Sequence, residues 1–200
     1  MKLIGITGGV GAGKTQVLSY LASHCSCRIL LADDVANEVK LPGQECYGQL
    51  VELLGEGVLD AEGRIDKGKM AALIFADREL LAKVNAIIHP AVKVYILQEL
   101  DKERKAGRIA FFFLEAALLI EEGYGKVADE LWYIHADADI RRRRLKESRN
   151  YTDEKIDRIF ASQLSEEEYR RHCRVVIDNN GTLEETLTQT EEALRREAYE

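Results

Sequence analysis

The sequence predicts an α/β fold in which helices cover both faces of a five-stranded, doubly wound parallel sheet. Short apolar runs alternate with longer stretches rich in Glu, Lys, Leu and Ala, which favour helix. One run, residues 109–114, is apolar throughout, as expected for a strand that is buried on both faces. A glycine-rich turn after the first apolar run leads directly into a helical stretch. Together these observations indicate strands joined by right-handed helical crossovers.

Each element follows from its local pattern. Apolar runs bounded by polar or glycine residues predict strands at 2–7, 28–31, 109–114, 131–134 and 175–177. Helices are expected at 15–23, 141–149, 154–174 and about 183–197. The stretch 35–104 is mostly helical, with expected breaks at Pro42-Gly43, at 55–63 and at Pro90. Ligands of such sheets bind beyond the carboxyl ends of the strands, so the residues after each strand are the candidates for function.

Composition limits the class of protein. The chain is 46% hydrophobic with a net charge of −7, which argues against nucleic acid or an anionic membrane as a partner. The four cysteines form no metal-ligand spacing, as expected for reduced thiols inside a cell. We see neither a cleavable signal nor an apolar run near the roughly 20 residues of a membrane span. We therefore expect a cytoplasmic enzyme or switch.

The stretch Gly8-Gly9-Val10-Gly11-Ala12-Gly13-Lys14-Thr15 is the strongest functional signal. Glycines let backbone N–H groups surround phosphate oxygens, and the helix that follows directs its positive end at them. In this pattern Lys14 reaches the β- and γ-phosphates and the Thr15 hydroxyl is placed to hold Mg²⁺. A plain glycine turn is the structural alternative, but the strand–loop–helix context favours nucleotide binding.

A switch GTPase is a poor interpretation of this loop. Such proteins carry an Asn-Lys-x-Asp motif that reads the base, and the sequence has none. The stretch Asp60-Ala61-Glu62-Gly63 matches their Asp-x-x-Gly, but no buried strand precedes it, so it is better explained as a surface turn.

Two carboxylates, Asp33 and Asp34, follow the second predicted strand. A kinase for a small molecule needs a group that takes the proton of the acceptor hydroxyl during phosphoryl transfer. The structural alternative is a helix N-cap, where aspartate is favoured. We expect Asp34 to be the cap and Asp33, nearest the end of the strand, to be functional.

The run Arg141-Arg142-Arg143-Arg144, with Arg149 beyond it, has three interpretations. A solvated helix face explains most of the arginines, whereas a nucleic-acid patch fits poorly with an acidic chain. The third interpretation is a lid whose guanidinium groups close over the phosphates, because charge accumulates on the transferring phosphoryl group. We expect at least one of these arginines to act in this way.

Taken together, these segments resemble the dephospho-coenzyme A kinase family over nearly the whole chain. The resemblance is carried, in family order, by GITGGVGAGKT, LLADDVANEV, LPGQECY, LLGEGVLDAEGRIDK, IFADRELLAKVNAIIHPAV, EAALLIEEGY, RRRRLKESR with IFASQLSEEE, and VVIDNNGTLEE. The chain differs from the family pattern at Leu31, Lys67 and Ala117, and RLKESR is one residue longer than usual.

The resemblance implies a P-loop kinase fold made of one domain over 1–200. A helical acceptor-binding region would cover about 35–105, and an arginine-bearing lid about 139–172. The reaction would transfer phosphate from ATP, with Mg²⁺, to the ribose 3′-hydroxyl of dephospho-coenzyme A.

The resemblance also implies residue roles. The triphosphate would be bound by Gly11, Ala12, Gly13, Lys14, Thr15 and Gln16, and the adenine would lie near Asn179 and Asn180. Asp33 would accept the proton of the 3′-hydroxyl, and Arg144 or Arg149 would close over the phosphoryl group. Glu121 matches a family glutamate near the substrate.

Several alternatives stay open at this point. His89 would line the acceptor pocket, although His89-Pro90 also fits a helix that ends at proline. The protein could instead be a kinase of nucleoside monophosphates or of another small alcohol, or a nucleotide-binding relative with weakened activity. Oligomeric state does not follow from the sequence.

Overall fold

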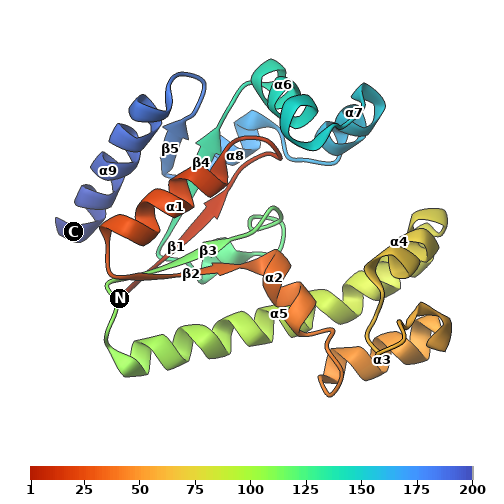
Figure 1. Ribbon diagram of the computed structural model, residues 1–200. Coiled ribbons are helices and arrows are strands. Elements are labelled where there is room, and N and C mark those ends of the chain that lie inside the picture. Colours follow the sequence, from red (N-terminus) through yellow and green to blue (C-terminus); the bar gives the residue numbers. More distant parts are fainter. Residues whose placement is uncertain (200) are drawn as a thin grey trace. The chain divides into compact units, whose positions relative to one another are not determined.

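The computed structural model describes residues 1–199, which divide into two compact units (Figure 1). The first unit contains Met1–Ile29 and the chain from Gly107 onward, and the second contains Leu30–Ala106. The boundary falls inside a strand, and each unit is described by itself below. That the chain forms one domain in the functional sense stays a prediction.

The sheet confirms the predicted architecture. Within the described residues it has five strands in the order β2-β3-β1-β4-β5, and the pairs β1–β3, β1–β4 and β4–β5 are parallel. The strands are β1 (Lys2–Thr7), β2 (Cys27–Leu31), β3 (Phe111–Glu115), β4 (Glu130–His135) and β5 (Val175–Asp178). Each begins within two residues of its predicted start, because apolar runs mark buried strands well.

The core of the first unit lies on the central strands. Phe112, Phe113 and Trp132 are fully buried, as continuous apolar strands require when both faces are covered. The helices of this unit are α1 (Lys14–His24), η2 (Tyr124–Lys126), α6 (Ala138–Arg149), α7 (Asp153–Ala161), α8 (Glu166–His172) and α9 (Leu183–Tyr199). Helix α1 packs beside α9, and α9 packs against β5.

The single helix expected over 154–174 is wrong, because the chain forms α7 and α8 there instead. Helix α8 begins at a capping box: the Ser165 hydroxyl accepts a hydrogen bond from the backbone N–H of Glu168, whose side chain accepts from the backbone N–H of Ser165. A Ser-x-x-Glu pattern in the sequence indicates such a helix start.

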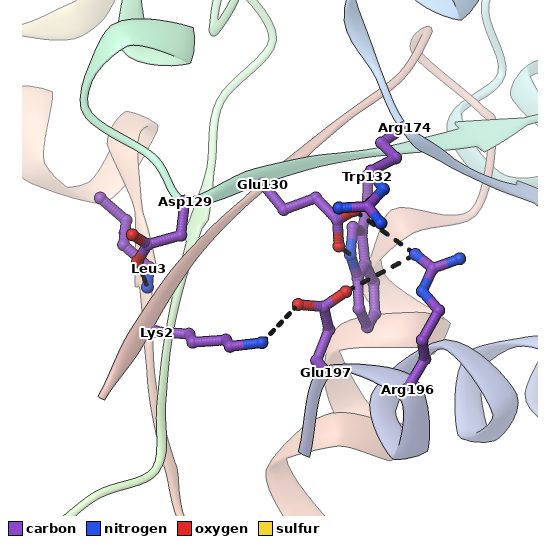
Figure 2. Close-up of polar contacts among 8 residues, drawn as sticks. All are labelled: Lys2, Leu3, Asp129, Glu130, Trp132, Arg174, Arg196 and Glu197. Atoms are coloured by element: carbon purple, nitrogen blue, oxygen red, sulfur yellow. Dashed lines mark hydrogen bonds and ion pairs between the residues drawn. The ribbon is translucent and has the colours of Figure 1, made fainter. Parts of the chain in front are cut away.

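Buried charges lie at the edge of the sheet where β1 and β4 begin, opposite the glycine loop (Figure 2). Figure 2 shows the carboxylates of Glu130 and Glu197 near each other, with the Arg196 guanidinium 3.4 and 3.5 Å from them. The Lys2 ammonium lies 3.2 Å from Glu197, and the Trp132 indole N–H donates to Glu130 over 3.1 Å. This cluster joins β1, β4 and α9, which are far apart along the chain.

The second unit is helical, with a long helix at its centre. It contains α2 (Ala32–Glu38), α3 (Glu45–Leu54), η1 (Glu56–Val58), α4 (Lys67–Ala76) and α5 (Arg78–Ala106), and α2, α3 and α4 all pack against α5. Apolar residues of α5 recur every four positions and are buried: Val84, Ile88, Val92, Ile96 and Leu100. That spacing places one apolar stripe along the helix.

The predicted break at Pro90 is wrong, because Pro90 lies inside α5. Proline removes one helical hydrogen bond at a cost of about 3 kcal/mol. The buried stripe on both sides of Pro90 offsets that cost, since α2, α3 and α4 pack against α5.

The expected N-cap at Asp34 is also wrong. Helix α2 begins at Ala32, directly after β2, and its N-cap residue is Leu31. Asp33 and Asp34 therefore lie in the first turn, where a negative charge favours the helix through its dipole.

By length and composition alone, α5 is long and apolar enough to cross a membrane, with an 18-residue window of mean hydropathy 1.4. This corrects the expectation that no stretch comes near such a length. In the second unit, however, α5 is the helix on which three others pack, and its buried apolar residues form one stripe.

Candidate functional site

The glycine loop connects β1 to α1 in a conformation that only glycine adopts easily. Gly8 has φ 146° and Gly13 has φ 94°, both in the range that L side chains rarely adopt. A Cβ at Gly8 would meet the backbone carbonyl of Ile134, and one at Gly13 would meet the side-chain amide of Asn179. The loop is therefore in close contact with β4 and with the end of β5, which fixes its shape.

Helix α1 begins directly at the end of the glycine loop. Its N-cap is Gly13, no side chain caps it, and its first turn has no acidic residue. The first N–H groups of a helix lack partners within the helix and form a positive end that binds anions. Thr15 and Gln16, in this first turn, are exposed. The arrangement fits a phosphate group at the start of α1.

Lys14 is held across the loop. Its ammonium donates a hydrogen bond of 2.8 Å to the carbonyl of Gly8 and lies 3.4 Å from a carboxylate oxygen of Glu115 at the end of β3. Both side chains are largely buried, with exposed fractions of 14% and 16%. A largely buried cation and a carboxylate thus meet where β1 and β3 end, and ligands of parallel α/β sheets bind beyond the carboxyl ends of the strands.

The two asparagines after β5 have different contacts. Asn179 is buried; its side-chain amide donates to the carbonyl of Ala12 over 2.7 Å and its Oδ1 accepts from the Thr186 hydroxyl over 2.8 Å. The side chain of Asn180 accepts from the backbone N–H of Asp137 over 2.7 Å. The Asn179 side chain therefore holds the glycine loop through the Ala12 carbonyl, while the Asn180 side chain links the ends of β4 and β5.

The structure separates the arginines of α6 by position. Arg144 donates to the backbone carbonyl of Asn179 over 2.9 Å and lies 3.4 Å from that of Ala12, so its guanidinium is at the loop. Arg149 is exposed in the last turn and lies over the ring of Tyr151, at 6.0 Å. Of the two predicted candidates, Arg144 is the one that contacts the loop.

The sequence analysis placed Arg141 in the arginine run but did not single it out as a site residue. Its guanidinium donates to the carbonyl of Val10 over 3.0 Å, pairs with the side chain of Gln163, and lies over the Phe160 ring at 4.2 Å. Burial lowers the pKa of Arg141, yet an arginine stays charged. Arg141 thus joins α7 and the segment after it to the glycine loop. The signals in the sequence were the arginine run itself and Gln163, a polar residue in the segment similar to the family lid.

The remaining predicted residues lie elsewhere. Glu121 is exposed in the turns after β3; burial raises the pKa of Tyr169 to about 12, and the charge of Glu121 adds to that rise. Asp33 is exposed in the first turn of α2, and His89 is half-buried in α5. Asp33 and His89 belong to the second unit, so their contacts are those of that unit.

Thr15 is the residue that was expected to hold Mg²⁺, and it is exposed at the start of α1. Within residues 1–199 no group of three or more His, Cys, Asp or Glu side chains could hold a metal ion by itself. Mg²⁺ commonly binds through one or two protein oxygens together with substrate phosphates. The exposed Thr15 at the start of α1 fits that mode.

Known proteins match this chain closely. The family model described as dephospho-CoA kinase matches residues 2–185. A dephospho-CoA kinase of Geobacillus kaustophilus is 36% identical over 186 residues, covering 93% of this chain and 92% of the relative. One from Geobacter sulfurreducens is 34% identical and covers 96% of both chains.

Solved structures agree with the fold. A crystal structure from Thermus thermophilus has a TM-score of 0.83 at 30% identity, covering 98% of this chain and 97% of that one. The dephospho-CoA kinase from Campylobacter jejuni has a TM-score of 0.73 at 17% identity, covering 97% and 96%. A shikimate kinase from Acinetobacter baumannii, at 0.56 and 14%, covers 98% and 92% and shares the P-loop kinase fold. The phosphate-binding loop, the parallel sheet behind it and these matches place the chain in the dephospho-CoA kinase family, a family of ATP-dependent kinases.

Proposed function

We propose that this protein transfers the γ-phosphoryl group of ATP to the ribose 3′-hydroxyl of dephospho-coenzyme A, giving coenzyme A and ADP. The observation that carries the proposal is the uncapped N-terminus of α1 next to Lys14, within a chain of this family. That site suits a triphosphate, and the family supplies the identity of the acceptor.

The phosphates are held by the loop from Gly11 to Gln16. The N–H groups at the start of α1 donate to phosphate oxygens, and Lys14 moves its ammonium from Gly8 toward the β- and γ-phosphates. Thr15 would hold Mg²⁺, which supplies neutralisation of the charge on the β- and γ-phosphates when it is bound. Asn179 and Asn180 lie beside the adenine.

The acceptor hydroxyl loses its proton to Asp33. As the 3′-oxygen bonds to the γ-phosphorus, the bond from that phosphorus to the β-phosphate oxygen breaks, and the proton passes to the carboxylate. A base of this kind contributes about 10²–10⁴-fold to the rate. Asp33 is exposed in the second unit, which leaves its carboxylate accessible to a substrate hydroxyl. His89 and Glu121 are the further residues that we propose near the acceptor.

Charge that develops on the transferring phosphoryl group is stabilised by Arg144. Its guanidinium already contacts the loop through backbone carbonyls, which a phosphate oxygen can replace as the partner. Arg149 contacts Tyr151 and would need to move further to do the same. We therefore assign this role to Arg144 and retain Arg149 as the second candidate.

Measurement of ADP release with Mg-ATP tests the proposal. Dephospho-coenzyme A would be compared with a panel of nucleoside monophosphates, and the expected result is turnover of dephospho-coenzyme A at much the highest kcat/KM. Preferred turnover of a monophosphate would replace this proposal with a nucleoside monophosphate kinase. Absence of turnover on every acceptor would indicate a relative with weakened activity, for which Leu31 and Ala117 are the first positions to examine. A cytoplasmic location, and the expectation that neither nucleic acid nor membrane is a partner, stay predictions.

A further inference from the structure

Two carboxyl groups are buried together at the edge of the sheet where β4 begins. The side chains of Glu130, in β4, and Glu197, in the last turn of α9, are 5% and 4% exposed. Figure 2 shows that the two groups lie near each other. Burial removes the water that would screen two negative charges, so such a pair favours a state in which one group holds a proton. The pair lies opposite the glycine loop, and the proposed reaction does not use it.

An oxygen without a donor indicates the role of that proton. Within residues 1–199, the Oε1 atom of Glu197 is buried and accepts no hydrogen bond. A protonated Glu130 carboxyl donates to Glu197, so the proton supplies the missing donor. A buried acceptor without a donor destabilises the folded state, and two facing carboxylates repel each other. One proton between them removes both costs.

Three cations surround the pair. The Lys2 ammonium, at the start of β1, lies 3.2 Å from Glu197. The Arg196 guanidinium lies 3.4 Å from Glu130 and 3.5 Å from Glu197. Arg174, which directly precedes β5, lies 3.5 Å from Glu130. All three side chains are partly exposed, so water screens their charges and they are weak substitutes for the proton.

We propose that one proton, shared by Glu130 and Glu197, acts as a latch that holds the last turn of α9 against the sheet and releases it as pH rises. Glu130 is fixed, because β4 is paired on both sides with β1 and β5. Glu197 lies in the last turn of a helix, and helix ends open at low cost. Once the proton is lost, fraying of this turn separates the two charges and brings Glu197 into solvent. The latch is independent of the proposed function.

The direction of the pH dependence follows from linkage. Burial, and then the hydrogen bond to Glu197, raise the pKa of Glu130 above its usual 4.5. The closed turn therefore binds the proton more tightly than the open turn does. The latch is fully closed below pH 4.5 and opens as pH rises through the raised value. Between these two values closing takes up one proton, so the opening equilibrium should increase about tenfold for each pH unit.

Trp132 is a built-in reporter of the proton. It is the only tryptophan in the sequence, it is fully buried, and its indole N–H donates to Glu130 over 3.1 Å. In the wild type, its fluorescence should change with pH with a midpoint above 4.5. Glu130→Gln should lack this change, because an amide does not titrate. Glu197→Gln removes the neighbouring charge, so the midpoint should move to lower pH.

Hydrogen exchange tests the latch itself. Amides in the last turn of α9 should exchange faster in the wild type than in Glu130→Gln at the same pH. The ratio of the two rates should rise about tenfold for each pH unit between 4.5 and the Trp132 midpoint. In Glu130→Gln the side-chain amide donates to Glu197 at every pH and keeps the turn closed. Glu192→Gln, at an exposed position of the same helix, is the matched control and should behave as the wild type.

Release of the last turn should leave the nucleotide loop in place. Thr186 of α9, which donates to Asn179, lies about 16 Å before Glu197 along the helix axis. One frayed turn corresponds to about 5 Å and does not reach that contact. The dissociation constant of ATP should therefore stay within about twofold across this pH window. A loss of ATP binding that follows the Trp132 titration and is absent in Glu130→Gln would overturn the assignment to the last turn.

Three further results would overturn the latch. The first is Trp132 fluorescence that does not titrate in the wild type, titrates equally in Glu130→Gln, or keeps its midpoint in Glu197→Gln. The second is an exchange ratio that does not change with pH. The third is equal protection of the last turn of α9 and of β4, because opening would then be global unfolding. Circular dichroism melts check the fold of each variant, and Glu197→Gln replaces Glu130→Gln in the exchange comparison if the latter does not fold.

Discussion

Replacement of Asn179 by alanine should destabilise the protein and weaken ATP binding together. The substitution removes the hydrogen bond to the Ala12 carbonyl and the one accepted from Thr186. Each is worth about 1 kcal/mol, and the buried Ala12 carbonyl is left without its shortest donor, which adds about 1 kcal/mol or more. Thr186 loses less, because its hydroxyl also lies 3.2 Å from the carbonyl of Thr182.

The sum is a loss of about 2–3 kcal/mol in the free energy of unfolding. For a chain of this length each 1 kcal/mol lowers Tm by about 2–4 °C, so a fall of roughly 5–10 °C is expected. Because the lost contact supports Ala12 inside the phosphate loop, KM for ATP should rise as well. Asn179→Asp should raise KM for ATP further, since a carboxylate would then face the Ala12 carbonyl and repel the triphosphate.

Gln189→Ala is the matched control. Gln189 also makes two hydrogen bonds at the end of β5, donating to the carbonyl of Asp178 and accepting from its N–H, each over 2.9 Å. These atoms are near solvent, so water can replace them and the change in Tm should be small. The measurements are thermal unfolding by circular dichroism and initial rates at varied ATP. Equal Tm values for Asn179→Ala and Gln189→Ala, with unchanged KM for ATP, would refute the reasoning.

Three further predictions follow from the other contacts. Asp33→Asn should lower kcat by at least about tenfold with little change in ATP binding, whereas Asp34→Asn should not; wild-type turnover of Asp33→Asn would move the base elsewhere. Arg141→Ala should lower Tm and raise KM for ATP more than Arg142→Ala, because Arg141 contacts the loop, whereas Arg142 makes exposed ion pairs and lies over the Phe160 ring at 5.6 Å; equal effects would contradict this. Burial, and then a hydrogen bond that the protonated Glu130 carboxyl donates to Glu197, raise the pKa of Glu130 above its usual 4.5, so stability should fall as pH rises through that raised value; urea unfolding of Glu130→Gln should lack the fall, and an unchanged pH profile would argue against it.

The elements that follow from local pattern were predictable from the sequence. Five apolar runs gave five strands, and the glycine loop gave the start of α1, because burial and backbone conformation are properties of short stretches. The continuation of α5 through Pro90 was not predictable. The packing of α2, α3 and α4 against α5 outweighs the local tendency of proline to end a helix. The start of α2 at Ala32 was missed for a similar reason: the strand runs into the helix without a turn that residue types could mark.

The arginines show the same limit within the site. Four consecutive arginines are chemically identical, so the sequence cannot tell which one meets the loop. Position around the helix decides: Arg141 and Arg144 are three residues apart and share a face, and both contact the glycine loop. Arg142 turns to Asp153 and Asp157 of α7 instead. Only the packing of α6 against the loop reveals this division of roles.

The hydrogen bond between Ala12 and Asn179 also sets an order of events during synthesis. The loop leaves the ribosome well before its supporting amide, which comes 167 residues later in the chain. At a translation rate of about 5–20 residues per second, that interval is on the order of 10–30 s. Pairing of strand β1 is delayed as well, because its neighbours in the sheet, β3 and β4, begin only at Phe111 and Glu130. A nascent chain that stops before β5 ends therefore carries the whole nucleotide motif without the contact that gives it shape, and it should not retain ATP until Asn179 has been made.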